Sequence, residues 1–380
     1  MRAAFLLILI FNAQIYGQDI SKARQLISTL SGEKFWGRGY THNGMSKAAH
    51  FLESEFKSYG LAPLNGKSFL QEFSYPVNTF PGKAEVSING IQLNPGIDFI
   101  VSPESDGINA SGVLTQNDSI HFIDEKNKVE VLLQKKLAWS VSTEVKDYTR
   151  ILVSKKKFNG IPYSINIKIK NKFIPKFKAS NVCGIIKGVE KPDSLIIISA
   201  HYDHLGGMGK ETYFPGANDD ASGIALLLSL ANYYSQNDPS YSIAFICFAG
   251  EEAGLVGSKY FVENSLIPLN KIRFLINLDL TGTGDEGITV VNGSLFKNEF
   301  IILNDINNKK GYLPKVKIRG KAGNSDHYWF TERGVPSFFI YTLGGIQAYH
   351  DVYDKAETLP LIEFEDLFHL IIDFNNRLMN

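Results

Sequence analysis

Four short apolar runs after Asn181 constrain the fold of this chain more than any other feature. They are Val182–Ile186, Leu195–Ser199, Ile243–Phe248 and Phe274–Leu278. Their content of β-branched and aromatic residues is typical of buried strands. Two stretches with a helical pattern, Ala221–Tyr234 and Gly254–Asn264, alternate with them. This alternation predicts an α/β fold with helices on both faces of a sheet.

Residues able to bind metal follow these predicted strands. The candidates that lie a few residues beyond a strand are His201, Glu251, Glu252 and Asp279. In open α/β sheets, sites form outside the carboxyl ends of the strands, so these side chains are expected to meet. The segments PGANDDASG (215–223) and Tyr349-His350-Asp351 add carboxylates and a second histidine. This ligand set predicts a pair of zinc ions and a hydrolytic reaction.

The pair His201 and Asp203 predicts an imidazole ligand with a carboxylate partner. Residues two apart in extended backbone lean to the same side, so the Asp203 carboxylate can receive the free ring N–H of a metal-bound imidazole. We therefore interpret Asp203 as a residue that orients His201 rather than as a ligand.

Adjacent acids in two loops suggest further roles. Either Asp219 or Asp220 could cap the helix that begins near Ala221, but a carboxylate there could also bridge two metal ions. Glu251 and Glu252 are neighbours whose side chains diverge in extended or looped backbone. One of them can therefore bind metal while the other faces the water that reacts.

Taken together, six segments resemble the secreted co-catalytic zinc aminopeptidases. The segments are SAHYDHLG, GANDDASG, AGEEAGLVGS, NLDLTG, GNSDHYWF and AYHDVYD, in this order and spacing. The wider family includes glutamate carboxypeptidases, glutaminyl cyclases and the transferrin-receptor ectodomain. The resemblance covers about Asn181–Asn380 well and the helical segment before Pro76 loosely. It implies a three-layer α/β/α sandwich with a mixed, mostly parallel central sheet.

The resemblance also implies two zinc ions per chain and a ligand for each position. The implied ligands are His201 and Asp279 for one zinc, Glu252 and His350 for the other, and Asp219 as the bridge. Relatives have a cis peptide after the bridging aspartate, which corresponds here to Asp219-Asp220.

Roles in the reaction are implied in the same way. Glu251 falls at the position of the family's general base, and Asp203 at the residue that orients His201. Tyr349 matches a tyrosine that in some relatives donates to the oxyanion, although an aromatic wall residue is an equal alternative. Asp326 is a candidate for contact with a ligand residue, and His204 is interpreted as a loop residue.

The first half of the chain has a different sequence pattern. Helices are expected at Ser21–Leu30 and Met45–Tyr59, and a strand at Phe69–Tyr75. Between residues 76 and 178, short alternating runs broken by Asn-Gly, Pro-Gly and Asp-Gly turns predict a β-rich insertion. Some relatives carry a protease-associated domain at this place. Residues 18–75 and 179–380 are then the predicted catalytic domain.

Residues 1–17 have the pattern of a secretory signal peptide. A basic start, an apolar run from Ala3 to Phe11 and the small Gly17 predict export to the periplasm or the outside, with cleavage near Gly17. The apolar run is shorter than the about 20 residues that a membrane span needs. We therefore expect no membrane association after cleavage.

Composition excludes some classes of partner. Lys plus Arg and Asp plus Glu number 39 each, so no net charge indicates nucleic-acid binding. Cys183 and Cys247 are too few for a disulfide scaffold, and we favour two buried thiols over a bridge. Eight lysines between Lys155 and Lys178 are interpreted as the solvated face of a hairpin.

The leading hypothesis is a secreted exopeptidase, an aminopeptidase that acts on peptides. One alternative is a glutaminyl cyclase, although a tryptophan commonly precedes the last histidine in cyclases and Tyr349 stands here. Carboxypeptidase or dipeptidase action is another, because those relatives share the metal centre. A receptor-like ectodomain without metals is disfavoured, because every expected ligand is present. The oligomeric state stays open.

Overall fold

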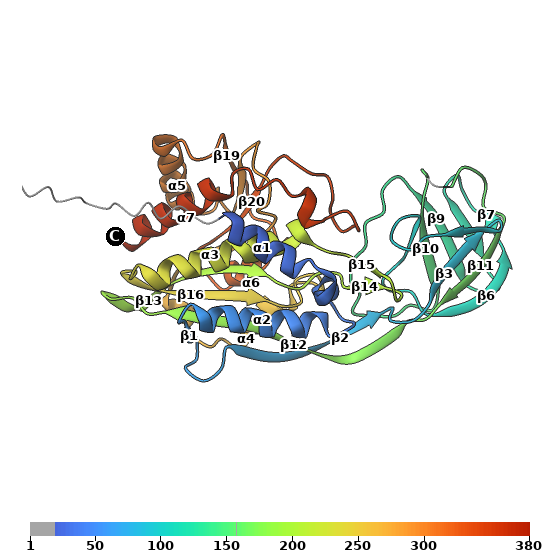
Figure 1. Cartoon of the computed structure of the whole chain (residues 1–380), viewed down its shortest axis with the longest axis horizontal. Helices are drawn as coiled ribbons and strands as arrows, with labels where there is room; N and C mark the ends of the chain where they lie inside the picture. The colour runs from blue at the N-terminus through green and yellow to red at the C-terminus, as the bar shows by residue number, and fades with distance from the viewer. Residues whose placement is uncertain (1–19, 157) are drawn as a thin grey trace, which may run out of the picture.

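A computed structural model describes residues 20–156 and 158–380 of the 380-residue chain (Figure 1). The predicted signal peptide, residues 1–17, lies outside the described residues and stays a prediction from the sequence. Within the described part, no helix is both long enough and apolar enough to span a bilayer.

A nine-stranded mixed, mostly parallel sheet forms the body of the molecule. Its strands, in spatial order, are β1 (Ala62–Pro63), β12 (Lys172–Ile186), β16 (Tyr241–Phe248), β13 (Lys191–His201), β17 (Ile272–Leu278), β20 (Ser337–Thr342), β18 (Ile288–Val291) and β19 (Val316–Ile318), with β2 (Leu70–Thr79) paired to β12. All four apolar runs predicted as strands lie in it. Strands β16, β13, β17 and β20 are parallel, so their carboxyl ends share one edge.

Helices cover both faces of this sheet, as predicted. One face carries α1 (Ile20–Leu30), α2 (Gly44–Ser58), α3 (Gly223–Gln236), α5 (Lys297–Lys310) and α7 (Phe364–Met379), and the other carries α4 (Val256–Glu263) and α6 (His327–Glu332). Alternation along β13 divides the core: Ile196 and Ile198 pack with the first group, and Ile197 packs with the second. Full burial of each such side chain stabilises the fold by about 1.5–3 kcal/mol.

Two of the predicted helices begin later than expected. A π-helical turn, η2 (Ala217–Ser222), precedes α3, and inside it Asp219 and Asp220 have non-helical backbone angles. Helix α4 starts at Val256 because Gly254 and Leu255 both have positive φ, 98° and 59°. Three short 3₁₀ turns complete the body: η1 (Glu33–Arg38), η3 (Leu269–Lys271) and η4 (Ala356–Thr358).

Residues 80–171, which connect β2 to β12, form two further sheets and are called the β-rich segment below. One sheet has the order β5 (Phe99–Val101), β10 (Thr149–Ser154), β9 (Val129–Gln134), β8 (His121–Asp124) and β7 (Thr115–Gln116). The other has the order β4 (Ile91–Leu93), β3 (Ala84–Ile88), β11 (Ser164–Ile169) and β6 (Ile108–Val113). Figure 1 shows this segment at one end of the molecule, with β2 and β12 running into it.

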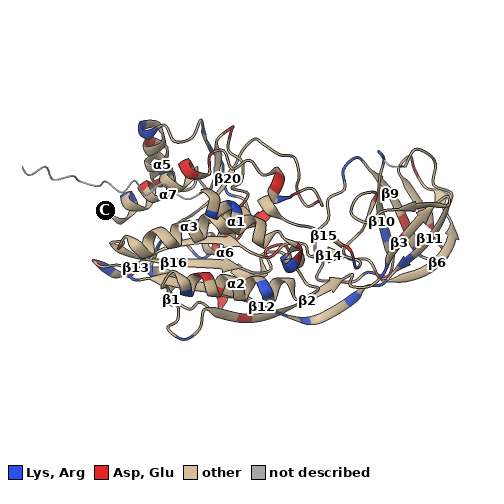
Figure 2. Cartoon of the chain, in the orientation of Figure 1, with Lys and Arg blue, Asp and Glu red and all other residues tan. Residues whose placement is uncertain are grey.

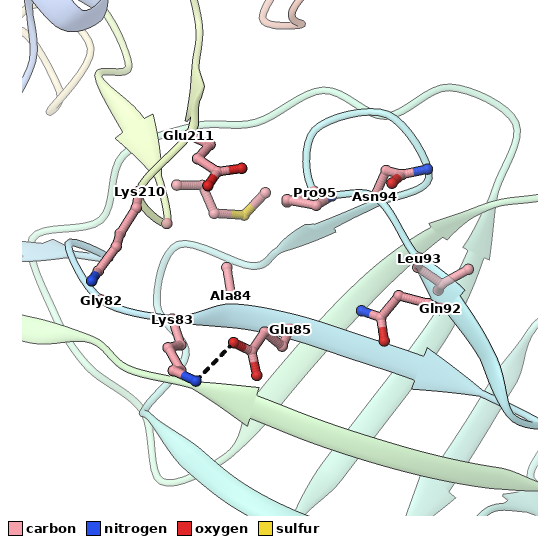
Figure 3. Close-up of a pocket in the computed structure, with 12 residues that line it drawn as sticks. Gly82, Lys83, Ala84, Glu85, Gln92, Leu93, Asn94, Pro95, Lys210 and Glu211 are labelled. Atoms are coloured by element: carbon pink, nitrogen blue, oxygen red, sulfur yellow. Dashed lines mark ion pairs between the residues drawn. The ribbon is translucent and has the colours of Figure 1, made fainter.

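One hairpin of the main body reaches toward the β-rich segment. Strands β14 (Gly207–Met208) and β15 (Thr212–Tyr213) pair just after the end of β13. Figure 3 shows Lys210 and Glu211 at the tip of this hairpin, on the opposite side of a pocket from Lys83 and Glu85. Glu85 lies on β3, and Lys83 comes directly before this strand. A cavity of about 440 Å³ lies between them.

The lysine-rich stretch does not form the predicted hairpin. Both edges of β11 are already paired, with β3 and β6, so β12 has no free edge of β11 and pairs with β2 instead. The side chains of Lys172 and Lys176 on β12 are exposed. Figure 2 shows that basic and acidic residues mix over both ends of the molecule.

The two cysteines are free, buried and on opposite faces of the sheet. Cys183 on β12 pairs in register with Ile246, and Cys247 on β16 pairs with Val182. Cys247 belongs to the apolar cluster under α3, whereas Cys183 belongs to the cluster under α4. Side chains that point to opposite faces cannot form a bridge.

We therefore expect that neither thiol reacts with Ellman's reagent in the folded protein, because both are buried. After unfolding without reductant, two thiols per chain should react. A denatured chain that yields no free thiol would contradict this arrangement of β12 and β16.

Candidate metal centre and active site

The predicted ligands converge at the carboxyl edge of the parallel strands. His201 is the last residue of β13, Asp279 follows β17, and Glu252 lies in the loop after β16. Asp219 comes from η2, ahead of α3, and His350 comes from the loop after β20. Five segments that are far apart in sequence therefore supply one site.

Asp219 lies between the two histidines. Its Oδ1 is 3.2 Å from His201 Nε2, and its Oδ2 is 3.2 Å from His350 Nε2. Asp279 Oδ1 is 3.6 Å from the same His201 nitrogen, and Glu252 Oε2 is 3.2 Å from the same His350 nitrogen. The site thus contains two pairs of predicted ligands, His201 with Asp279 and His350 with Glu252. The carboxylate of Asp219 lies between the pairs and contacts both imidazoles.

Hydrogen bonds to main-chain oxygens define which nitrogen of each imidazole faces the centre. His201 Nδ1 is 3.1 Å from the carbonyl oxygen of Asp203, and His350 Nδ1 is 2.8 Å from that of Trp139. A carbonyl oxygen only accepts, so Nδ1 carries the proton in both rings. In the neutral ring, the form that binds a metal ion, Nε2 then has the lone pair on the side of the centre.

The Asp203 carboxylate holds the glutamate loop. Its Oδ1 is 3.8 Å from His201 Nδ1, which donates to the main-chain oxygen instead. The carboxylate accepts from the amides of Glu251 at 3.1 Å and Glu252 at 3.3 Å. Asp203 thus contacts His201 through its carbonyl and the two glutamates through its side chain. Burial raises the pKa of this carboxyl to about 7.

Glu251 and Glu252 have opposite electrostatic surroundings. Burial and the neighbouring Asp219 raise the pKa of Glu252, but His350 and the hydrogen bond from His204 lower it to about 2. Burial raises the pKa of Glu251 well above its usual value, although His201 opposes this effect. Glu252 is therefore the better anion, and Glu251 the better proton acceptor.

His204 contacts one of the predicted ligands, which its interpretation as a loop residue did not predict. It lies in a loop, but it is fully buried, and its Nδ1 is 2.7 Å from Glu252 Oε1. Because a carboxylate accepts, this nitrogen carries the proton and donates to Glu252. A second histidine at His201 + 3, close behind a predicted strand, was the available signal in the sequence.

The two aspartates of η2 divide the roles that the sequence left open. Asp220 Oδ1 accepts from the amide of Gly223 at the start of α3, at 2.9 Å, and from Leu280 at 3.1 Å. Asp220 is therefore the residue at the helix start, and Asp219 faces the imidazoles. The peptide bond between them is cis, as the family resemblance implied.

Buried hydroxyl and amide groups support Asp279. Ser325 donates to Asp279 Oδ2 at 3.1 Å, Asn277 donates to Ser325 at 2.8 Å, and Ser199 donates to Asn277 at 2.7 Å. Asp326 is hydrogen-bonded to Ser258, and burial raises its pKa to about 7. Asp326 contacts none of the predicted ligands through a hydrogen bond among the described residues.

Arg38 and Asp354 form hydrogen bonds with the main chain of the loop that carries Asp219. The fully buried Arg38 guanidinium donates to five main-chain oxygens, those of Leu30, Tyr202, Pro215, Gly216 and Asp219, at 2.8 to 3.2 Å. The Asp354 carboxylate accepts from the amides of Asn218 at 2.8 Å and Asp219 at 3.1 Å. Sequence reasoning missed both residues because nothing in their local pattern indicates contacts across more than 100 positions.

Tyr349 lies against His350. Their rings stack with centroids 4.0 Å apart and planes 15° apart, and the tyrosine is 46% exposed. Burial and the surrounding carboxylates, Asp219 first among them, raise the pKa of its phenol. The hydroxyl therefore keeps its proton at neutral pH and can act as a donor.

The residues present fit zinc. Asp279 Oδ1 is buried and has no hydrogen-bond partner, and the same is true of His204 Nε2. Burial lowers the pKa of His350, yet Glu252 and Asp219 outweigh it and raise the pKa to about 11. A positive charge between these groups is thus strongly favoured. Paired imidazole and carboxylate ligands, with one carboxylate able to bridge, suit zinc ions.

Curated proteins with similar sequences include metalloproteases and an aminopeptidase. A "probable zinc metalloprotease" from Pyricularia oryzae is 39% identical over 114 residues, which are 29% of this chain and 23% of that protein. "Aminopeptidase YwaD" from Bacillus subtilis is 29% identical over 174 residues, 42% of this chain and 34% of that protein. The chain thus spans about a quarter to a third of the length of these curated relatives.

Solved structures share the fold over almost the whole chain. A peptidase M28 precursor from Shewanella amazonensis has a TM-score of 0.74 at 15% identity and covers 96% of this chain and 94% of its own. BSAP, a zinc aminopeptidase from Bacillus subtilis, has a TM-score of 0.68 at 19% identity, with 93% of each chain covered. The profile of peptidase family M28 matches residues 181–374, just over half of the 380. The predicted resemblance is thereby confirmed, and the chain belongs to peptidase family M28.

Proposed function

We propose that the protein is a zinc-dependent aminopeptidase that removes N-terminal residues from peptides. The observation that carries this proposal is the position of Asp219, with each oxygen 3.2 Å from a different imidazole. One carboxylate shared by two ligand groups is the arrangement of a two-metal hydrolase. A single-zinc glutaminyl cyclase would not need it. The names of the similar proteins, zinc metalloprotease and aminopeptidase, support the same activity.

In this proposal each zinc has two ligands of its own and one shared ligand. His201 and Asp279 would hold one ion, Glu252 and His350 the other, and Asp219 both. Zinc ions bound there would lower the pKa of a water molecule toward neutrality and polarise the peptide carbonyl. Asp203 would position His201 by its carbonyl and both glutamates by its carboxylate, which the distances given above support.

Glu251 would move the proton. It accepts a proton from the attacking water and returns it to the leaving amine, a task that requires a carboxyl with high proton affinity. Its raised pKa, beside the lowered pKa of Glu252, supports this division between the two acids. Tyr349 would donate its phenol hydrogen to the developing oxyanion, a role that its stacking on His350 supports.

Substitution of Glu251 by Gln should lower kcat roughly 10²–10⁴-fold, because general base catalysis contributes about that much. The amide has nearly the same size but cannot accept the proton, so zinc content should stay at two per chain. The checks are turnover of a leucyl anilide and metal analysis after dialysis. Glu263→Gln, at an exposed position on α4, is the matched control and should retain full activity. Full activity of Glu251→Gln would remove Glu251 from the mechanism.

A peptide panel blocked at one end should separate the exopeptidase types. Acetylation of the amino terminus should abolish cleavage, and amidation of the carboxyl terminus should leave it within about threefold, because an aminopeptidase recognises the free amine. The measurement is mass spectrometry of the products. Cleavage of the acetylated peptide alone would indicate carboxypeptidase action. Cyclisation of a glutaminyl peptide by a protein with one zinc would indicate a cyclase.

We also propose that Arg38 positions Asp219. Arg38→Lys leaves several buried carbonyl oxygens unpaired, and each unpaired group costs about 1–3 kcal/mol, so unfolding free energy should fall by about 3 kcal/mol or more. Zinc retention during dialysis should fall with it. Arg24 offers the control: it is exposed and donates to the carbonyl oxygens of Leu359 and Pro360. Arg24→Lys should cost less than about 1 kcal/mol. Equal effects of the two substitutions would contradict the proposed role.

A further inference from the structure

The β-rich segment contacts the proposed metal centre directly, through the main chain of Trp139. Its amide donates to the main-chain oxygen of His350 at 2.8 Å. Its carbonyl oxygen accepts from His350 Nδ1, also at 2.8 Å. These reciprocal bonds fix both the backbone and the ring of the histidine whose Nε2 faces Asp219 and Glu252.

The core of the β-rich segment holds Trp139 in place. Its indole is only 5% exposed, and Nε1 donates to the carbonyl oxygen of Val101 on β5 at 2.7 Å. The ring stacks on Phe214, with centroids 4.7 Å apart and planes 26° apart, and lies 6.2 Å from the ring of Phe80. The position of the carbonyl that orients His350 therefore depends on how this core packs.

The same core encloses parts of the loops that carry the other proposed ligands. Leu205, Met208 and Phe214 lie between His201 and Asp219 in sequence and are buried in the apolar cluster of the β-rich segment. The amide of Gly209 donates to the carbonyl oxygen of Phe80 at 2.8 Å. Val352, two residues after His350, packs on the cluster as well. One apolar core thus braces the chain on both sides of the centre.

From these contacts we propose that the β-rich segment supports the metal centre structurally and that Trp139 is the residue that positions His350 to bind zinc. Partners of the second ring nitrogen of a metal-bound histidine set its orientation, and their loss typically weakens metal binding 10–100-fold. This inference rests on the proposed function, in which His350 is a zinc ligand.

Exposed contacts between the β-rich segment and the loop that carries His350 contribute less to the position of His350. Lys136 Nζ donates to the carbonyl oxygen of Gln347 at 2.7 Å and lies 3.7 Å from Asp351 Oδ2. The lysine side chain is half exposed. Surface pairs of this kind are screened by solvent and have small effects. Trp139, which is buried and bonded to His350 twice, is therefore the residue to test.

The test compares zinc affinities of full-length variants, measured by competition with a chelating dye and by metal content after dialysis. Trp139→Ala removes the indole that fixes the carbonyl, and we expect the zinc held by His350 and Glu252 to bind 10–100-fold less tightly while the zinc held by His201 and Asp279 is unchanged. Trp139→Phe keeps a ring on Phe214 but loses the bond to Val101, so a smaller loss is expected.

The matched control is Phe122→Ala, which removes an aromatic ring that is 1% exposed from the same core, on β8. It should lower the unfolding midpoint about as much as Trp139→Ala and leave both zinc affinities within about twofold. Retention of both affinities by Trp139→Ala, or an equal loss in Phe122→Ala, would overturn the positioning role.

His350→Ala, measured in parallel, separates failure of this inference from failure of the proposed function. Loss of one zinc in His350→Ala, with none lost in Trp139→Ala, refutes the role of Trp139 alone. Zinc content in His350→Ala equal to that of the unchanged protein refutes the proposed ligand, and the inference with it.

Discussion

Asp219 is buried with one carboxylate oxygen toward His201 and the other toward His350. Burial of an ionised carboxylate costs several kcal/mol unless opposite charge and hydrogen bonds offset it. That offset comes here from imidazoles on two different segments, His201 at the end of β13 and His350 in the loop after β20, so the distance between these segments has to be held fixed. The surrounding structure is best understood as the set of contacts that meets this requirement.

Those contacts act mainly on the main chain. Arg38 binds the carbonyl oxygens of the Asp219 loop, Asp354 binds its amides, and Trp139 binds the backbone and ring of His350. Main-chain groups cannot change rotamer, so a ligand whose backbone is held at several points has little freedom left. Preorganisation of this kind reduces the entropy that a site loses when it binds an ion.

The central sheet and the ligand types could be predicted from the sequence because they depend on local pattern. Apolar runs such as Leu195–Ser199 identify buried strands, and a histidine or acid just beyond a strand lies at the functional edge. Partners of those ligands could not be predicted in the same way. Trp139 contacts His350 across 211 positions, and Arg38 contacts Asp219 across 181. A single chain gives no pattern for such pairs.

The lysine-rich stretch shows the same limit for strands. Local alternation correctly indicated strand at Ile165–Ile169, but whether the next strand pairs with it depends on which edges are free, and β3 and β6 already occupy both. The chain therefore leaves the small sheet after β11, and β12 pairs with β2 and runs into the main sheet. That continuity ties the β-rich segment to the body through two long paired strands, in addition to the contacts at Trp139. A displacement of the segment would accordingly have to bend these strands, which makes a fixed brace for His350 a better physical description of it than a loosely attached domain.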